Sequence, residues 1–220
     1  FDAQSRYLLE LVRLQSPDLI ALTGDLADEF TDFSMLPPLL EGLTALAPTF
    51  YVTGNHEWRV PGLRGILAQM RACGVTVLQD DWRVLRRGED ALIVAGTDDP
   101  CGPAERKTPA ELIADIRAEA GEAAFLLLLA HRNDQLPQWS ALGVQAGHCH
   151  GGVVRLPFVG GLFGTDRRLF PAWDAGLYRQ GETALYVSRG LGYTNVHFRL
   201  FNRPEVAVIV LRRGSPAINS

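Results

Sequence analysis

The sequence Thr49-Phe50-Tyr51-Val52-Thr53-Gly54-Asn55-His56-Glu57 runs from an apolar, β-branched segment directly into a polar turn. Aromatic and β-branched residues favour an extended strand, and glycine favours the turn that ends it. Asn55 and His56, adjacent at a strand end, have no obvious role in packing. The stretch therefore predicts a buried strand that delivers polar side chains to a site beyond its carboxyl end.

Three more apolar runs end in polar residues of the same kind. They are residues 19–22 before Thr23-Gly24-Asp25-Leu26-Ala27-Asp28, residues 123–130 before His131, and residues 144–146 before Gly147-His148-Cys149-His150. Four of the five histidines thus follow strand-like runs. A lone buried histidine is usually satisfied by a hydrogen bond, but four at strand ends favour a metal site, because imidazole nitrogens and carboxylate oxygens converge there.

The order of the predicted elements indicates an α/β fold. Helices are predicted at 2–15, 33–46, 61–72 and from 108, and strands at 18–23, 49–53, 75–78, 82–85, 91–95, 125–129, 144–146, 185–188 and 206–211. Alternating strands and helices followed by a strand-rich tail predict a four-layer sandwich of two mixed β-sheets flanked by helices. With 220 residues, the chain fits a single domain, 1–220. Residues 155–181 have little periodicity and are predicted as a long loop near the site.

The bulk composition excludes several classes of protein. The net charge is −4 and no basic run appears, so a nucleic-acid partner is not expected. Cys73, Cys101 and Cys149 are too few and too scattered for a disulfide framework and are expected as reduced thiols. No apolar run reaches the roughly 18 residues of a membrane span. Phe1 is not an initiator methionine, so a signal or anchor before it leaves the location open between cytoplasm and cell envelope.

The four motifs, in their order, resemble the signature of calcineurin-like metallophosphoesterases. Residues 96–100, 187–192 and 199–205 are similar to one bacterial branch, which includes envelope-associated phosphodiesterases and hydrolases of nucleotide-linked lipid precursors. The resemblance implies a metallophosphoesterase-like fold and metal-dependent hydrolysis of phosphoester bonds. A phosphodiesterase or pyrophosphohydrolase that uses a metal-bridging hydroxide is the expected activity.

The resemblance also implies a ligand set for two divalent metal ions. Asp25 would bridge the ions, Asn55, His131 and His148 would complete the shell of one ion, and His150 would bind the other. Mixed nitrogen and oxygen ligation favours manganese, iron, zinc or nickel over magnesium or calcium. The catalytic set implied by the family is completed by His56.

His56 would donate a proton to the leaving group, because its ordinary pKa lies near about 6.5. One family motif is missing, a first strand that ends in Asp-x-His and supplies two ligands to the second ion. Losing about three buried apolar side chains with that strand would cost roughly 5–9 kcal/mol, against a typical total stability of about 5–15 kcal/mol. We therefore expect the native polypeptide to contain this strand before Phe1. Without it, one ion or none would bind.

Two groups of residues leave alternatives open. Asp98 and Asp99 fit either turn residues that bond their own backbone or partners that orient a metal-bound histidine. In residues 155–181, aromatics alternate with arginines such as Arg167 and Arg168. This pattern fits a site for a lipid-linked nucleotide, with peripheral membrane association, as well as a loop that packs on itself.

The sequence is also consistent with three other functions. A degenerate family member could bind a ligand without turnover, and a phosphomonoesterase or protein phosphatase would use the same metal chemistry on other phosphate esters. Cys149 is expected to pack and His197 to be structural. The sequence leaves the oligomeric state open.

Overall fold

A computed structural model describes residues 5–103, 106–121, 125–132, 143–146, 155–156, 160–162, 169–171, 173–181, 183–192 and 199–212. The helices are α1 (Arg6–Leu14), α2 (Leu36–Leu46), α3 (Leu63–Ala72) and α4 (Pro109–Ala120), with 3-10 turns η1 (Phe33–Met35) and η2 (Glu57–Arg59). The strands are β1 (Ile20–Leu22), β2 (Thr49–Tyr51), β3 (Thr76–Val77), β4 (Asp81–Arg87), β5 (Asp90–Gly96), β6 (Phe125–Ala130), β7 (Gly143–Ala146), β8 (Arg155–Leu156), β9 (Gly160–Gly161), β10 (Gly176–Gln180) and β11 (Thr183–Val187).

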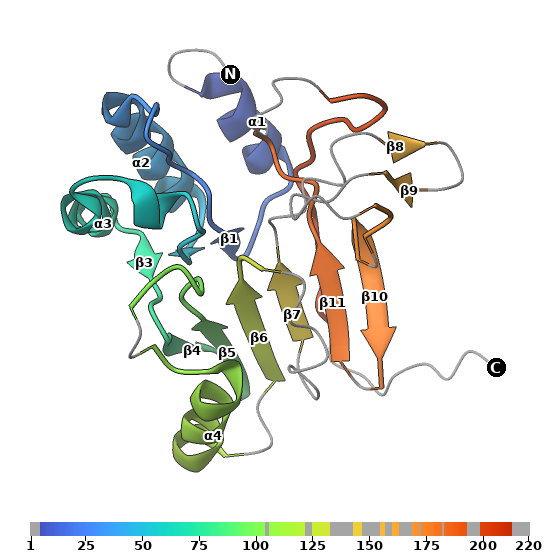
Figure 1. Cartoon of the computed structure of the whole chain (residues 1–220). Helices are drawn as coiled ribbons and strands as arrows, with labels where there is room; N and C mark the ends of the chain where they lie inside the picture. Colours follow the sequence, from blue (N-terminus) through green and yellow to red (C-terminus); the bar gives the residue numbers. More distant parts are fainter. Residues whose placement is uncertain are drawn as a thin grey trace.

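The strands form two main sheets, as Figure 1 shows. Parallel strands β1, β2 and β3 make the smaller sheet in that order. The larger sheet has the order β10-β11-β7-β6-β5-β4, with parallel pairs in its centre and antiparallel pairs at both edges. The antiparallel pair β8–β9 stands apart from both. The two-sheet α/β architecture predicted from the sequence is confirmed.

The side chains of β6 show how the layers stack. Leu126 and Leu128 pack in one apolar cluster with residues of α4, whereas Leu127 and Leu129 pack in another with Phe50 of β2. Successive residues of a strand point to opposite faces, so a strand buried on both sides is apolar throughout. Two further clusters join α1, α2 and α3 to the smaller sheet. The layers are therefore helices, small sheet, large sheet and α4.

The predicted strand at 206–211 is wrong. Residues 202–212 form no helix or strand and pair with no strand of the described chain, and Val208 and Val210 are exposed. A β-branched sequence favours an extended backbone, but a strand also needs a partner edge. In the described residues β1 has a single neighbour, β2, so the smaller sheet ends at β1. An additional strand before Phe1 stays a prediction.

The predicted long loop at 155–181 is wrong at its ends, because it contains β8, β9 and β10. Strand β10 pairs antiparallel with β11 over Gly176–Gln180. Asp174 links these three strands: its carboxylate accepts hydrogen bonds from Arg155 Nη1 (2.8 Å), the Gly161 N–H (2.6 Å) and the Tyr178 hydroxyl (2.7 Å). Strands β8 and β9 have two residues each, too few for a periodic pattern, and in β10 the apolar residues Leu177 and Tyr178 are adjacent, so no alternation revealed these strands. In the described part of the chain, no helix has the length and apolar character needed to cross a bilayer.

Gly96, the last residue of β5, lies where the two sheets meet. A Cβ at this position would approach Val52 Cγ1 and Leu78 Cβ to 2.4 and 2.6 Å, which is well below ordinary packing distance. Gly65, in α3, faces open space. The close approach of the two sheets therefore requires glycine at position 96.

We expect Gly96→Ala to lower the free energy of unfolding by about 1–3 kcal/mol through overpacking. Gly65→Ala is the matched control and should raise it by about 0.5–1 kcal/mol, since alanine favours a helix interior. Urea unfolding measures both. Equal effects of the two substitutions would contradict the tight junction between the sheets.

Candidate metal centre

The turn after β1 and the turn after β2 lie against each other. Gly24 (φ 84°) and Asp25 (φ 52°) both adopt left-handed backbone, which is unusual for an aspartate. A Cβ on Gly24 would lie 2.6 Å from His131 Nδ1 and 2.7 Å from the Gly54 nitrogen, and a Cβ on Gly54 would overlap Asp25 Oδ1. The two turns can approach this closely only because both glycines lack a side chain.

The carboxylate of Glu57 joins these turns. It is fully buried and accepts four backbone N–H groups: from Asp25 (3.0 Å), Leu26 (2.6 Å), Ala27 (3.0 Å) and Gly54 (2.9 Å). Burying a charge is costly unless it is fully hydrogen-bonded, and here both oxygens have two donors each. Burial of Tyr51 and the nearby charge of Glu57 raise the pKa of the Tyr51 hydroxyl well above its usual range. The sequence did not indicate a role for Glu57; its place directly after His56 in the polar turn was the one available signal.

Three donor atoms meet at one point beside this pair of turns. His131 Nε2 lies 3.2 Å from Asp25 Oδ2 and 3.3 Å from Asn55 Oδ1. The other ring nitrogen, Nδ1, lies 2.8 Å from the carbonyl oxygen of Thr23, to which it must donate. This bond fixes the ring and directs Nε2 toward the Asp25 and Asn55 oxygens, where a neutral imidazole would offer it to a cation. The convergence of Asp25, Asn55 and His131 follows the sequence prediction.

The charges at this point favour an ionised aspartate. Burial acts to raise the pKa of Asp25, but the hydrogen bond and charge of His131 and the N–H of His56 bring it below its usual value. Burial lowers the pKa of His131, yet bonding to Asp25 raises it overall. A proton and a cation would compete for Nε2, so metal binding should weaken in acid.

His56 stands at the edge of the same centre. Its backbone N–H donates to Asp25 Oδ1 (3.0 Å), which fixes the Asp25 side chain. Its ring nitrogens lie 4.0 Å from Asp25 Oδ2 and 3.9 Å from Glu29 Oε2. The ring is partly exposed, so it can reach a substrate that approaches Asp25.

The donor set fits one divalent cation. A carboxylate oxygen, an amide oxygen and an imidazole nitrogen are ligands that manganese, iron or zinc accept together. Within the described ranges there is no group of three His, Cys, Asp or Glu residues that could hold a metal, because the third donor is the amide of Asn55. His148 and His150, with Cys149, lie outside the described residues, as do His197, Arg167 and Arg168. Their roles stay predictions.

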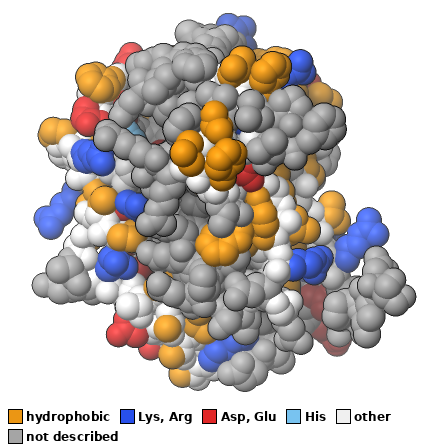
Figure 2. Space-filling view, turned by 45° about the vertical axis from the view of Figure 1, so that its right-hand side comes forward, with side chains coloured by type: hydrophobic (Ala, Val, Ile, Leu, Met, Phe, Trp, Pro, Cys, Tyr) orange, Lys and Arg blue, Asp and Glu red, His pale blue; other side chains and the backbone are white. Residues whose placement is uncertain are grey.

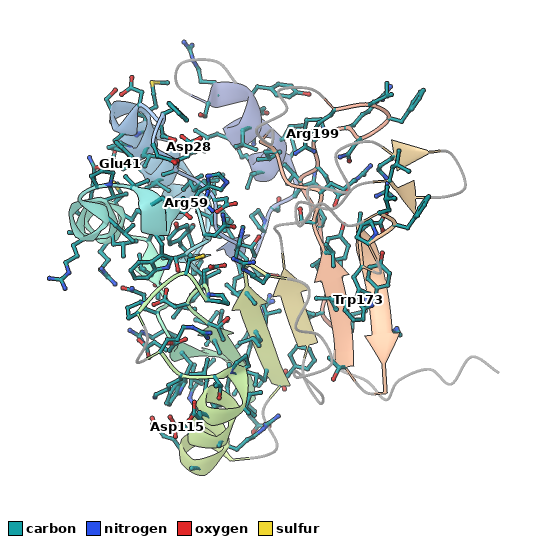
Figure 3. All side chains as sticks on the ribbon, in the orientation of Figure 1. Asp28, Glu41, Arg59, Asp115, Trp173 and Arg199 are labelled. Carbon is teal, nitrogen blue, oxygen red and sulfur yellow. The ribbon has the colours of Figure 1, made fainter. Side chains whose placement is uncertain are left out.

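Other carboxylates around this centre accept hydrogen bonds from neighbouring groups. Asp28 (Figure 3) accepts the Phe30 N–H (3.0 Å) and the Thr31 hydroxyl (2.7 Å), so it stabilises its own loop. Asp98 accepts the hydroxyl of Thr53 (2.6 Å), and burial raises the pKa of Asp98.

Asp99 is a turn residue that also forms an ion pair, and no hydrogen bond of the described residues joins it to His131. Its carboxylate accepts the Cys101 N–H (2.8 Å), as a turn residue does, and it also pairs with Arg132 Nε (2.9 Å), the residue after His131. Burial acts against the charged form of Asp99, but Arg132 lowers its pKa overall. The orienting partner of His131 is the Thr23 carbonyl.

Comparisons with known proteins agree with the fold and the motifs. The sequence profile of the family described as calcineurin-like phosphoesterase matches residues 1–159. The chain is 30% identical over 205 residues to the uncharacterized metallophosphoesterase YkuE of Bacillus subtilis, covering 89% of this chain and 68% of that protein. It is 33% identical over 208 residues to phosphodiesterase YaeI of Escherichia coli, covering 90% and 71%. The solved structure of Haemophilus influenzae NAD nucleotidase superposes with a TM-score of 0.56 at 14% identity, covering 85% of this chain and 43% of that one. This last likeness concerns the fold alone.

We expect Glu57→Gln to lower the free energy of unfolding by about 2–4 kcal/mol, because the amide group would face buried N–H donors that then lack an acceptor. Urea unfolding measures the loss. Glu29→Gln removes an exposed carboxylate from the neighbouring loop and should change stability by less than about 0.5 kcal/mol. If Glu57→Gln were as mild as its control, Glu57 would not be what joins the two turns.

Proposed function

The chain belongs to the calcineurin-like phosphoesterase family of phosphoester hydrolases, and we propose that its own reaction is the hydrolysis of a phosphodiester or a pyrophosphate. One observation supports a working enzyme: an oxygen of Asp25 and an oxygen of Asn55 both lie within 3.3 Å of the buried Nε2 of His131. The relative YaeI is named a phosphodiesterase, which favours a diester substrate.

The family generally uses a pair of divalent metal ions. We infer that Asp25, Asn55, His131 and His148 hold one ion and that His150, with Asp25, belongs to the other. When bound, the ions polarise the phosphoryl oxygens and lower the pKa of water. Manganese, iron, zinc and nickel are the candidates, because mixed nitrogen and oxygen donors suit them.

The protein's own groups prepare this site. The Thr23 carbonyl accepts a hydrogen bond from His131 Nδ1, so Nε2 is the ring nitrogen that would bind a cation between Asp25 and Asn55. The Asn55 amide carries no charge, so it binds an ion without reducing its attraction for phosphate oxygens. His56, partly exposed beside Asp25, would donate the proton that the leaving alkoxide needs.

The substrate class follows from the arginines and aromatics of residues 155–181. Arginine pairs with phosphate through two parallel hydrogen bonds, and an apolar surface accommodates a lipid tail. We propose a small phosphate ester or a lipid-linked nucleotide as the substrate, reached by a protein that associates with the membrane surface.

We expect His56→Ala to lower turnover of bis(p-nitrophenyl) phosphate with Mn²⁺ by about 10²–10⁴-fold while the metal content stays the same. Asp25→Ala should lose both turnover and metal, since it removes a donor of the shared site. Plasma emission spectrometry gives the metal content. Asp18→Asn is the control and should change neither, since Asp18 is an exposed carboxylate before β1 that pairs with Arg87, away from the metal centre.

A parent protein that binds metal yet hydrolyses no diester would favour a degenerate, binding-only family member. Faster hydrolysis of p-nitrophenyl phosphate than of the diester would favour a monoesterase or protein phosphatase.

We expect the double substitution Arg167→Ala with Arg168→Ala to reduce hydrolysis of a lipid-linked nucleotide by about tenfold and to spare a small chromogenic diester. The reason is that the arginines would bind the phosphates beyond the scissile bond. Steady-state kinetics with both substrates tests this. Equal loss on the two substrates would count against a role in specificity.

A further inference from the structure

Two copies of the tripeptide Arg-Leu-Phe, at residues 168–170 and 199–201, present exposed apolar side chains. Leu169 and Phe170 are 58% and 56% exposed, and Leu200 and Phe201 are 45% and 69% exposed. Large apolar side chains that gather at the surface usually mark an interaction site. We call these four residues the Leu-Phe patch. Figure 2 shows hydrophobic side chains in neighbouring groups on the face that carries β8 and β9.

The backbone holds both phenylalanines in an unfavourable conformation. Phe170 and Phe201 each have φ near 53°, in the left-handed region that bulky residues avoid. In each case the result is an exposed ring where folding alone would favour a buried one. A strained and exposed aromatic at the same position of both tripeptides indicates a functional constraint.

Backbone hydrogen bonds join the two tripeptides through β8 and β9. The Arg155 N–H donates to the carbonyl of Leu200 (3.0 Å), and the Phe170 N–H donates to the carbonyl of Leu162 (3.0 Å). Because Arg155 of β8 pairs with Gly161 of β9, the two tripeptides flank the β8–β9 pair, one on each side. Neighbouring strands are about 4.8 Å apart, so the Leu-Phe patch spans roughly 15 Å.

The carboxyl-terminal part of the sequence, which carries the Leu-Phe patch, is basic, although the whole chain is acidic. Residues 155–220 contain nine arginines and four acidic residues, whereas residues 1–154 contain 12 basic and 21 acidic residues. The described acidic side chains of this region, Asp174 and Glu205, are each bonded to an arginine.

Two exposed arginines, Arg179 and Arg203, make no ion pair with any described residue. Arg199 (Figure 3) instead donates to the carbonyls of Arg189 and Gly192, so it braces the backbone behind the patch. The partner of this surface must therefore be both apolar and anionic.

We propose that the Leu-Phe patch docks the protein on an anionic lipid bilayer. Leu169, Phe170, Leu200 and Phe201 enter the boundary between headgroups and acyl chains, and Arg203, two residues after Phe201, contacts the anionic headgroups. The docking surface rests on the membrane association proposed above, but docking requires no catalysis, so vesicle binding and diester hydrolysis can fail independently. It would bring a lipid-linked substrate to the enzyme.

Flotation with vesicles tests the docking surface directly. We expect the protein to bind vesicles of phosphatidylcholine with about one third phosphatidylglycerol at about 0.1 M salt, and to bind pure phosphatidylcholine more weakly. Phe170→Asn with Phe201→Asn should reduce binding about tenfold, because apolar insertion is lost while asparagine tolerates the left-handed backbone. Arg203→Gln should reduce binding to anionic vesicles alone, by about fivefold.

Phe30→Asn is the matched control, since Phe30 is 91% exposed in the loop after β1, outside the Leu-Phe patch, and its substitution should leave binding unchanged. Circular dichroism melting establishes that each variant is folded. If the asparagine pair does not melt cooperatively, Leu169→Ser with Leu200→Ser replaces it. Failure of the parent to bind either vesicle, or equal loss in the Phe30 control, would overturn the proposal.

Discussion

The buried carboxylate of Glu57 is the constraint on which the metal centre depends. A charge without access to water is tolerated only when every oxygen is hydrogen-bonded, and Glu57 meets this with four N–H groups from two separate turns. Those bonds compensate for the left-handed backbone of Asp25 and hold it against Gly54. Asp25 is thus positioned by Glu57, which does not itself contact the point where the three donor atoms meet.

The second requirement is that the two sheets pack at a fixed distance. Asp25 and Asn55 follow strands of the smaller sheet, but His131 follows β6 of the larger one. Its ring crosses between the sheets to bond the Thr23 carbonyl, so a shift between sheets would separate the donors. The glycine at position 96 and the alternating leucines of β6 therefore contribute to the chemistry as well as to stability.

The sequence predicted the strand ends and the three donors, because hydrophobic periodicity and turn residues are local signals. It could not predict the Glu57 bonds, since nothing in Gly-Asn-His-Glu shows which distant N–H groups a carboxylate will reach. The strand expected at 206–211 failed for a related reason: β propensity is local, but pairing depends on another edge. Strand β10 was missed because its sequence does not alternate between apolar and polar residues. His148 and His150 lie outside the described residues, so their roles stay predictions.

The most direct test is an anomalous diffraction map from crystals of the protein grown with Mn²⁺. If Glu57 and the sheet packing bring the donors together as described, we expect a peak in contact with Asp25, Asn55 and His131 that is absent from crystals of Asp25→Ala. Manganese bound elsewhere, with no density beside these three side chains, would contradict the metal centre.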